Sequence, residues 1–299
     1  MEIQQTDLLL RECREGCPDF NKWFKVFVII LFCFILAAPS SYAQKNDSLP
    51  FQSGEILNFD IRYKYGLVML KAGTAKYKIN AGTLNSQPTY RSSLDFKTSS
   101  FFDKIFIIRD SLYSHASNPE LTPLYHKRSV NEGSTHFKED VFILKHSSEY
   151  SEARVKRERN NEVRFDTILT ANKLGYDLLN LFVFIRTLDY STLKVGDNFQ
   201  LVAFMDKSNI NIILHYAGQS VIDKSNKVKY KTHKFNVDIA DKAFNTSKKS
   251  LEIWISDDDN RIPLKLKAQL KIGAAEADLS SYSNLKNPFN AEVKISPRK

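Results

Sequence analysis

The chain has 299 residues, with 43 Lys and Arg against 34 Asp and Glu, and 42% of its residues are hydrophobic. This composition excludes collagen-like, low-complexity and wholly disordered chains, and three cysteines are too few for a small domain held together by disulfides. The length allows one large domain or two small ones.

The first predicted element is an export signal. Two lysines precede an apolar run, residues 26–38, and a small-x-small pattern that ends at Ala43 follows it. A transmembrane helix needs about 20 apolar residues, so this run is short for a membrane span. We predict cleavage after Ala43, with residues 1–43 as a signal peptide that includes a long polar N-terminal extension, and residues 44–299 as a single exported β domain. An uncleaved anchor is the alternative.

All three cysteines lie in the predicted signal peptide, namely Cys13, Cys17 and Cys33. A mature chain without cysteine suits an oxidising compartment, so we expect a periplasmic or secreted protein. The same absence excludes a cysteine nucleophile, a thiolate metal site and redox CxxC chemistry in the mature chain.

After the leader, the sequence shows the period-2 alternation of half-buried strands. The clearest example is residues 264–272, where Leu, Ala and Ile alternate with Lys and Gln. The further predicted strands are residues 57–65, 69–79, 94–96, 105–108, 121–130, 135–144, 149–155, 162–165, 199–205, 210–216, 228–239, 251–255 and 292–295.

One segment, residues 176–189, has helical periodicity instead. Leu178, Leu181 and Ile185 recur at helical spacing, and Asp177 is the predicted N-cap. The helix is apolar almost all round, so we expect the sheet to cover it. Strands and helices do not alternate along the chain, which disfavours a parallel Rossmann-type sheet. The predicted fold is mainly β, a curved antiparallel sheet or incomplete β-barrel with one apolar helix packed against it.

Common catalytic motifs are absent from the sequence. It contains no GxxxxGK[ST], GxGxxG, GxSxG or HExxH, and its six histidines include no close pair at metal-ligand spacing. The acidic run at residues 257–259 lacks the glycine and glutamate of an EF-hand loop and predicts a polar hairpin turn instead. We predict no catalytic residue, no metal site and no cofactor. Four acidic residues beside apolar runs are weak candidates for acid–base chemistry: Glu55, Asp60, Asp103 and Asp110.

Lysines recur at alternate positions in three predicted strands: Lys76 and Lys78; Lys227, Lys229 and Lys231; Lys265, Lys267 and Lys271. They have two interpretations. One is a surface for anionic lipid headgroups, lipopolysaccharide or nucleic acid. The other is a solvated outer face whose lysines deter edge-to-edge pairing. Aromatic residues do not interleave with the lysines as a base-stacking surface requires, so no nucleic-acid partner is expected.

The aromatic residues also have two interpretations. Phe101, Phe102, Phe106, Phe182 and Phe184 would line a cavity for an acyl chain or form ordinary core. The candidate ligand-binding residues are Phe106, Phe182, Arg186 and Trp254.

Several short patterns occur in a family-specific order: Gly54-Glu55-x-Leu57-x-Phe59 with Tyr63, Tyr65 and Gly73; Asp110 and Leu121-Thr-Pro123; Tyr176-Asp177-Leu178 and Ile185-Arg186; and Leu251-Glu-Ile-Trp254-Ile-Ser-Asp257-x-Asp259-x-Arg261-Ile-Pro263 with Gly273. Together they resemble the exported bacterial family called domain of unknown function 3108, over nearly all of residues 52–279. The resemblance implies secreted or periplasmic proteins of Gram-negative bacteria, shaped like the periplasmic lipoprotein carriers whose concave face holds acyl chains around a helix. It implies no catalytic residue. Asp110, Arg186 and Arg261 are expected to form ion pairs behind the sheet.

These observations lead to one expected function and two alternatives. We expect a non-catalytic periplasmic protein that binds a hydrophobic or amphipathic envelope component, a lipid or lipoprotein, in a concave antiparallel sheet, with no stable membrane span after signal cleavage. The first alternative is an envelope scaffold that docks partners through its sheet edge or basic face. The second is a hydrolase of envelope polymers that uses two carboxylates.

Overall fold

A computed structural model of the chain describes residues 49–104, 106–224, 228–239, 250–270 and 273–293. The predicted signal peptide and its cleavage site therefore lie outside the described residues, as do Lys227 and Lys271. Within the described residues, no helix has the length and apolar composition needed to cross a membrane.

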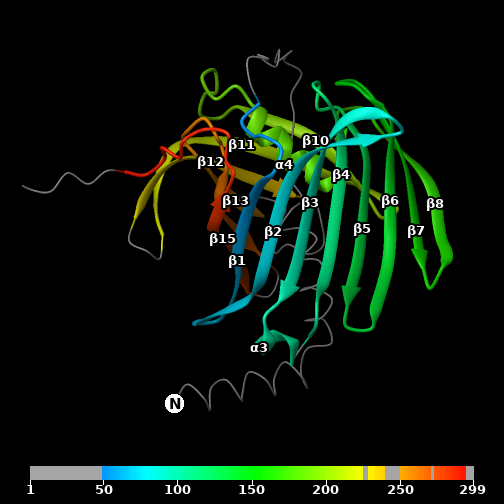
Figure 1. The fold of residues 1–299 in the computed structure, drawn as a ribbon, viewed down its shortest axis with the longest axis horizontal. Helices are drawn as coiled ribbons and strands as arrows, with labels where there is room; N and C mark the ends of the chain where they lie inside the picture. Colours follow the sequence, from blue (N-terminus) through cyan, green and yellow to red (C-terminus); the bar gives the residue numbers. More distant parts are fainter. Residues whose placement is uncertain (1–48, 105, 225–227, 240–249, 271–272, 294–299) are drawn as a thin grey trace, which may run out of the picture.

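In this part of the chain, fifteen strands form one sheet (Figure 1). They are β1 (Glu55–Tyr65), β2 (Val68–Leu84), β3 (Gln87–Thr98), β4 (Arg109–Ser117), β5 (Pro123–Glu132), β6 (Thr135–His146), β7 (Ser151–Arg159), β8 (Glu162–Ala171), β9 (Gly175–Tyr176), β10 (Asn198–Met205), β11 (Ser208–Asp223), β12 (Lys229–Ile239), β13 (Leu251–Ser256), β14 (Pro263–Gln269) and β15 (Ala274–Ser283). The helices are the single turn α3 (Ser100–Asp103) and α4 (Leu178–Thr187).

The sheet is a long antiparallel meander that turns back on itself. Its order is β8-β7-β6-β5-β4-β3-β2-β1-β15-β14-β13-β12-β11-β10-β9, so the first and last strands pair in the middle and β8 and β9 are the edges. All neighbouring pairs are antiparallel except β9 with β10. The two ends of the sheet come close together, because β7 and β8 contact β9, β10 and β11. The predicted mainly β, incomplete barrel is confirmed.

Helix α4 lies on the inner face of this curved sheet and contacts β3, β4 and β5. It begins after Asp177, whose carboxylate accepts hydrogen bonds from the backbone N–H groups of Leu179 and Asn180, as the sequence predicts. Most of its side chains are buried, and the ring of Phe182 lies 4.4 Å from that of Tyr77 on β2. The helix therefore fills the inside of the barrel with apolar side chains.

A second, smaller core lies where the two ends of the sheet meet. Val141, Ala153 and Val155 pack there against Val202 and Phe204. We call this contact between β6–β7 and β10 the seam. Strands β7 and β10 are not neighbours in the hydrogen-bonded order of the sheet, so side chains hold the seam together.

Polar contacts add to the seam on either side of its apolar cluster. The Arg157 guanidinium lies 3.2 Å from a carboxylate oxygen of Asp206, and the Asn209 amide donates to the backbone carbonyl of Thr170. Gly175 is required because a Cβ at this position would lie 2.1 Å from the ring of Phe204.

The structure differs from the sequence prediction in several places. Residues 106–108 form no strand, because Ser99 caps α3 and the chain then turns back; Ile108 makes only an isolated bridge to Glu132. Near the C-terminus, Glu292 likewise makes only an isolated bridge, to Tyr230. Strands β4, β9 and β15 are additional to the predicted set, and the helix is shorter than predicted, because Tyr176 belongs to β9 and Asp177 is the N-cap.

Candidate functional site

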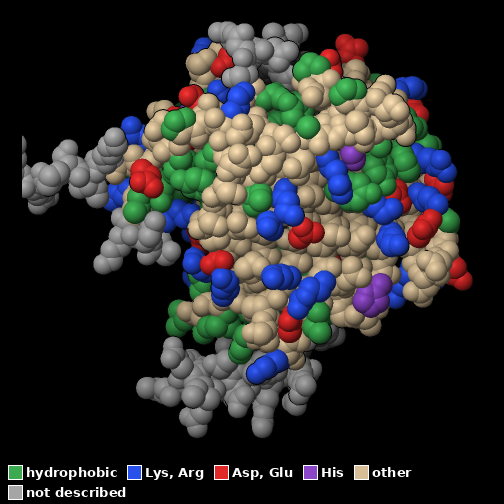
Figure 2. All heavy atoms as spheres, viewed as in Figure 1, with side chains coloured by type: hydrophobic (Ala, Val, Ile, Leu, Met, Phe, Trp, Pro, Cys, Tyr) green, Lys and Arg blue, Asp and Glu red, His purple; other side chains and the backbone are tan. Residues whose placement is uncertain are grey.

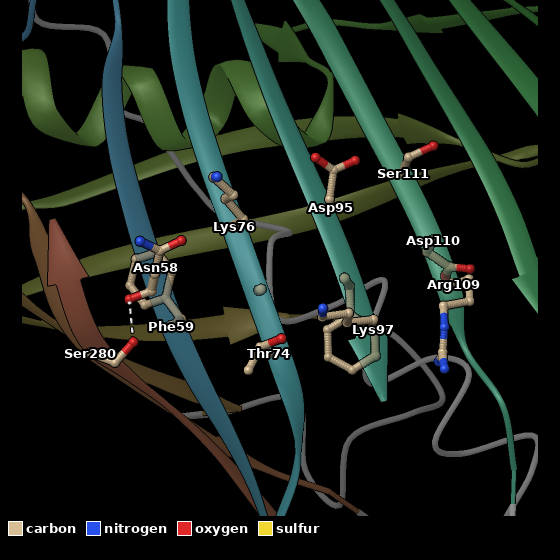
Figure 3. A pocket seen from close by; sticks show the side chains of 12 residues that line it. Asn58, Phe59, Thr74, Lys76, Asp95, Lys97, Arg109, Asp110, Ser111 and Ser280 are labelled. Atoms are coloured by element: carbon tan, nitrogen blue, oxygen red, sulfur yellow. Dashed lines mark hydrogen bonds between the residues drawn. The ribbon is translucent and has the colours of Figure 1, made fainter. Parts of the chain in front are cut away.

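Two adjoining grooves lie on the outer face of β1–β4, with volumes of about 520 and 840 Å³. They share Asp95 of β3 and Ser111 of β4 as lining residues. Figure 3 shows the first groove, with side chains projecting from neighbouring strands and α4 behind the sheet. We call the two grooves together the basic groove.

The strand register explains how distant parts of the sequence meet in the basic groove. Lys76 of β2 lies opposite Asn58 of β1 on one side and Asp95 of β3 on the other, and Asp95 lies opposite Ser111 of β4. Because side chains alternate between the two faces of a strand, these four residues form one row across the outer face. Short polar side chains, such as Asn58 and Ser111, leave the space that the longer lysine side chains border.

The charge of the basic groove is positive and largely uncompensated. Lys76, Lys78 and Lys97 form no ion pair within the described residues. The Arg91 guanidinium lies over the ring of Tyr113, 4.7 Å from its centroid, and not against a carboxylate. Figure 2 shows this face, where blue Lys and Arg side chains lie across a polar surface. Two acidic residues line the groove as well, the exposed Asp95 and the buried Asp110.

Two basic side chains near these lysines or on another strand are instead neutralised by a carboxylate. Lys265 of β14 lies 2.6 Å from Glu276, and Arg109, at the border of the basic groove, lies 2.6 Å from Asp103. Strand β2 is in the interior of the hydrogen-bonded order, so its lysines do not protect an edge. Lys76 and Lys78 of β2 therefore differ from Lys265 and Arg109, because no carboxylate lies within ion-pair distance of either lysine in the part of the chain that the structure describes.

Inside the barrel, Arg186 of α4 forms a fully buried ion pair with Glu55 of β1. The closest nitrogen–oxygen distance is 2.5 Å, and neither side chain is exposed. The guanidinium also donates to the backbone carbonyls of Pro50 and Asn260. Burial opposes the charged form, but the Glu55 carboxylate outweighs it and raises the pKa of Arg186 above its ordinary value. The guanidinium donates four hydrogen bonds to protein oxygens, and these bonds fix the helix to β1 and to the loops that cover it.

A serine, a histidine and an aspartate also meet inside the barrel, at the start of α4. The Ser114 hydroxyl donates to Asp177 at 2.5 Å, and His126 Nδ1 lies 2.8 Å from the Ser114 oxygen. The order is the reverse of a hydrolytic triad, because the serine proton is directed at the carboxylate and not at the histidine. All three residues are buried. This trio positions α4 and offers no accessible nucleophile.

A pair of carboxyl groups, Asp110 and Glu132, lies beside the inner wall near Arg128. Burial raises the pKa of Asp110, while hydrogen bonds from the Asn131 backbone N–H, at 2.8 Å, and with the Glu132 side chain oppose that effect. A glycoside hydrolase keeps its two carboxyl groups about 5–9.5 Å apart in an open cleft. These two groups are in direct hydrogen-bond contact and almost fully buried, so their arrangement does not match that requirement.

Of the predicted ligand-binding residues, Phe182 and Arg186 lie one turn apart on α4, whereas Phe106 and Trp254 lie elsewhere. Phe106 packs near Gly133, Phe182 lies against Tyr77, and Arg186 is held by Glu55. Trp254 is half-buried, with the Lys234 ammonium 4.9 Å from the centre of its ring. The structure does not bring these four side chains together.

Of the three residues expected to form ion pairs behind the sheet, Arg186 does so, whereas Asp110 and Arg261 make other contacts. Arg186 pairs with Glu55, a residue that the expectation did not include. Arg261 donates to the backbone carbonyl of Leu188 and lies over the ring of Tyr190. Asp110 accepts from a backbone N–H, as described above.

The acidic run after β13 forms the predicted turn. Asp258 accepts hydrogen bonds from Ser256 and from the backbone N–H groups of Asn260 and Arg261. Asp257 instead lies 2.9 Å from His233. Among the described residues, no group of three or more His, Cys, Asp or Glu side chains is arranged to hold a metal ion.

The fold defines this protein as a barrel-like antiparallel β protein with a helix inside. A solved structure supports that class: the crystal structure of a β-barrel-like protein of domain of unknown function DUF1849 from Brucella abortus is similar, with a TM-score of 0.52 and 9% sequence identity over 79% of this chain and 100% of that chain. The family described as "Protein of unknown function (DUF3108)" matches residues 58–280, which is more than half of the sequence, and the chain belongs to that family. No curated protein matches the sequence.

Proposed function

We propose that this protein is an exported, non-catalytic binding protein of the bacterial cell envelope, and that the basic groove holds the anionic group of an amphipathic envelope component such as a phospholipid or a lipoprotein. The location rests on the apolar run at residues 26–38 and on the cysteine-free chain after Ala43. The binding role rests on the outer face of β1–β4.

The observation that carries the proposal is the set of cations without carboxylate partners around the basic groove. Lys76, Lys78 and Lys97 place three positive charges on two neighbouring strands, and the carboxylate of Asp95 offsets one of them. A fixed cluster of this kind attracts anions and raises their local concentration. Each lysine near an anionic surface contributes about 1 kcal/mol.

The neutral residues of the groove suit a phosphate or carboxylate group. The hydroxyls of Thr74, Ser93 and Ser111 line the grooves among the cations and can donate hydrogen bonds to anionic oxygens. Hydrogen bonds to a charged acceptor are stronger than those between neutral groups. The ring of Tyr113 already holds the Arg91 guanidinium in place, which reduces the entropy that the side chain loses on binding.

A second candidate is binding of an acyl chain inside the barrel, around α4. One observation favours it: the seam between β7 and β10 is held by side chains and not by a backbone ladder, so its opening breaks no backbone hydrogen bonds between those two strands. In that case the ligand would displace side chains of α4, since the helix fills the inner face.

The experiment is a titration of the mature chain, starting at Gln44, with a soluble short-chain phosphatidylglycerol below its micelle concentration, followed by calorimetry at low and high salt. We expect binding that weakens as salt screens the charges. A double variant, Lys76→Gln with Lys78→Gln, should weaken binding on the order of tenfold or more.

The matched control is Lys229→Gln with Lys231→Gln, which removes two alternate exposed lysines from β12. It changes the net charge equally and should retain wild-type affinity. Equal weakening by both double variants would contradict a site at the basic groove, and so would equal binding of short-chain phosphatidylcholine. Native mass spectrometry of the gently extracted protein tests the second candidate, because a lipid retained by both double variants would indicate binding in the interior.

A further inference from the structure

The β1–β2 hairpin extends beyond the strands on both sides of it. Strand β15 meets β1 only as far as Lys64, and β3 meets β2 only as far as Gly73. Residues 65–69 therefore pair only within the hairpin, and Figure 1 shows it projecting at the lower left of the sheet. We call residues 65–69 the hairpin tip.

The hairpin tip is apolar and exposed. Leu67 is 100% exposed, and Tyr65 and Met69 are 43% and 42% exposed. Gly66, with a φ of 57°, takes the left-handed conformation that a tight two-residue turn needs, and this turn places Leu67 at the extreme end. A single exposed leucine is ordinary on a protein surface, but three large apolar side chains on one projecting ribbon indicate an interaction site.

The surroundings of the hairpin tip are basic. Lys64 directly precedes it and is exposed, and Lys104 follows α3, which is tied to β2 by a hydrogen bond from the Ser99 N–H to the Ala72 carbonyl. Neither lysine forms an ion pair in the described part of the chain.

The nearby carboxylates are already compensated. Asp60 lies 2.7 Å from Lys71, and Asp103 lies 2.6 Å from Arg109. The free charge around the apolar tip is therefore positive, and a partner that matches it is both apolar and anionic.

Another exposed apolar residue, Ile107, lies at the same end of the barrel. In an antiparallel meander the β1–β2 and β3–β4 connections lie at the same end of the sheet. The β3–β4 connection carries Ile107, which is 48% exposed. Leu67 and Ile107 thus lie at the same end of the sheet as the cationic Lys104.

We propose that the hairpin tip inserts into the surface of an anionic lipid bilayer, with Leu67 leading, Tyr65 and Met69 at the level of the headgroups, and Lys64 and Lys104 against the lipid phosphates. Apolar side chains that enter the acyl boundary, together with lysines that contact the anionic leaflet, are the usual elements of a peripheral membrane contact. This surface is separate from the basic groove, so the inference goes beyond the function proposed above.

The test uses the mature chain from Gln44 and vesicles of phosphatidylethanolamine with phosphatidylglycerol, compared with vesicles of phosphatidylcholine alone, in a sedimentation assay. We expect wild-type protein to bind the anionic vesicles, and Leu67→Asp to reduce the partition coefficient on the order of tenfold or more, since a charge then replaces the leucine that enters the bilayer. The control Val195→Asp alters a residue that is 75% exposed in the connection between α4 and β10, at the opposite end of the barrel, and should bind like wild type.

A second readout separates insertion from purely electrostatic adsorption. Leu67→Trp should show a blue-shifted emission and quenching by brominated phosphatidylglycerol, while Val195→Trp should show neither. Failure of wild-type protein to bind either kind of vesicle, or equal binding by wild type and Leu67→Asp, would overturn the proposal. Leu67→Asp should still bind soluble short-chain phosphatidylglycerol. This control shows that its loss of vesicle binding does not come from damage to the basic groove.

Discussion

Arg186 is a fully buried cation, and its charge is balanced by one carboxylate, that of Glu55. A buried ion pair adds little net stability, but removing one partner leaves an uncompensated charge in a low-dielectric interior. Truncation of one side chain of this pair should therefore destabilise the fold far more than the same truncation in an exposed ion pair.

We expect Arg186→Met to lower the free energy of unfolding by about 3–5 kcal/mol, and Glu55→Leu together with Arg186→Met to recover much of that loss. The control is Arg62→Met, which breaks the partly exposed pair with Asp278 and should cost less than about 1 kcal/mol. Urea denaturation measures all of these. Equal losses for the two arginine variants would contradict the account.

His126 is the second residue for which burial predicts a measurable effect. Burial lowers the pKa of the imidazole, and the Asp177 carboxylate opposes this only in part. In the unfolded chain a histidine titrates near pH 6.5. As the pH falls below that value the unfolded state takes up the proton first, so the stability that the neutral imidazole maintains above about pH 6.5 is lost progressively in acid.

We therefore expect His126→Asn, which keeps a nitrogen near the Nδ1 position and cannot ionise, to reduce the dependence of stability on pH between 7.5 and 5. The reduction should be no more than about 1.4 kcal/mol per pH unit, the value for one proton. Urea denaturation of both proteins at several pH values measures the slopes. Parallel slopes would show that another histidine with a lowered pKa, such as His146, dominates.

These residue-level contacts also mark the limit of sequence analysis. Glu55 and Arg186 were both singled out, but they are separated by 131 positions, and periodicity contains no information about which strand a helix faces. The residues of the basic groove are also brought together by contacts between distant parts of the sequence. Alternation identifies Lys76 and Lys78 as neighbours on one face, whereas Asp95 and Ser111 join them only through the register of two strand pairs, β2–β3 and β3–β4.

At the scale of elements, the success of the prediction follows the strength of the local signal. Helix α4 was predicted because Asp177 caps an apolar segment, and β14 because buried leucines alternate with lysines. Strand β15 was not predicted, since its alanines, serines and acidic residues have low strand propensity. Strand β15 is held in the sheet by its pairing with β1 and β14. Such long-range contacts leave no pattern in the local sequence.

The start of α4 is the element whose loss should affect the protein most. One carboxylate, that of Asp177, accepts hydrogen bonds from two backbone N–H groups, from the Ser114 hydroxyl and from the Asn180 side chain. Its removal leaves several buried donors without an acceptor.

We expect Asp177→Ala to lower the free energy of unfolding by more than the roughly 0.5–2 kcal/mol of an ordinary N-cap, because the buried Ser114 hydroxyl also loses its acceptor. Ser99→Ala, which removes the cap of the one-turn helix α3, provides the comparison and should cost about 1 kcal/mol or less. Thermal and urea unfolding monitored by circular dichroism give both values. A loss of the same size in both variants would mean that the trio around Ser114 contributes nothing beyond the cap.

For the molecule as a whole, the organisation of the sheet predicts where the barrel opens first. Thirteen of its strands are held on both sides by neighbours in the hydrogen-bonded order, whereas β8 and β9 are edges, and the two ends of the sheet meet through the side chains of the seam. Local opening in proteins follows the regions with the fewest buried contacts and the least protected hydrogen bonds. The barrel should therefore open at the seam before any strand pair near β1 separates.

Phe204→Ala is the variant that tests this expectation, because Phe204 is 1% exposed and belongs to the small seam cluster. We expect it to increase backbone hydrogen exchange in β7, β8 and β10 while leaving β1 and β2 protected, with a global cost of about 3–5 kcal/mol at most. Phe96→Ala is the matched change in the main core, where Phe96 is 2% exposed, and should increase exchange throughout the sheet. If both variants changed exchange uniformly, the seam would be an integral part of one cooperative barrel, and an acyl chain would have no route to the interior that is easier than global unfolding.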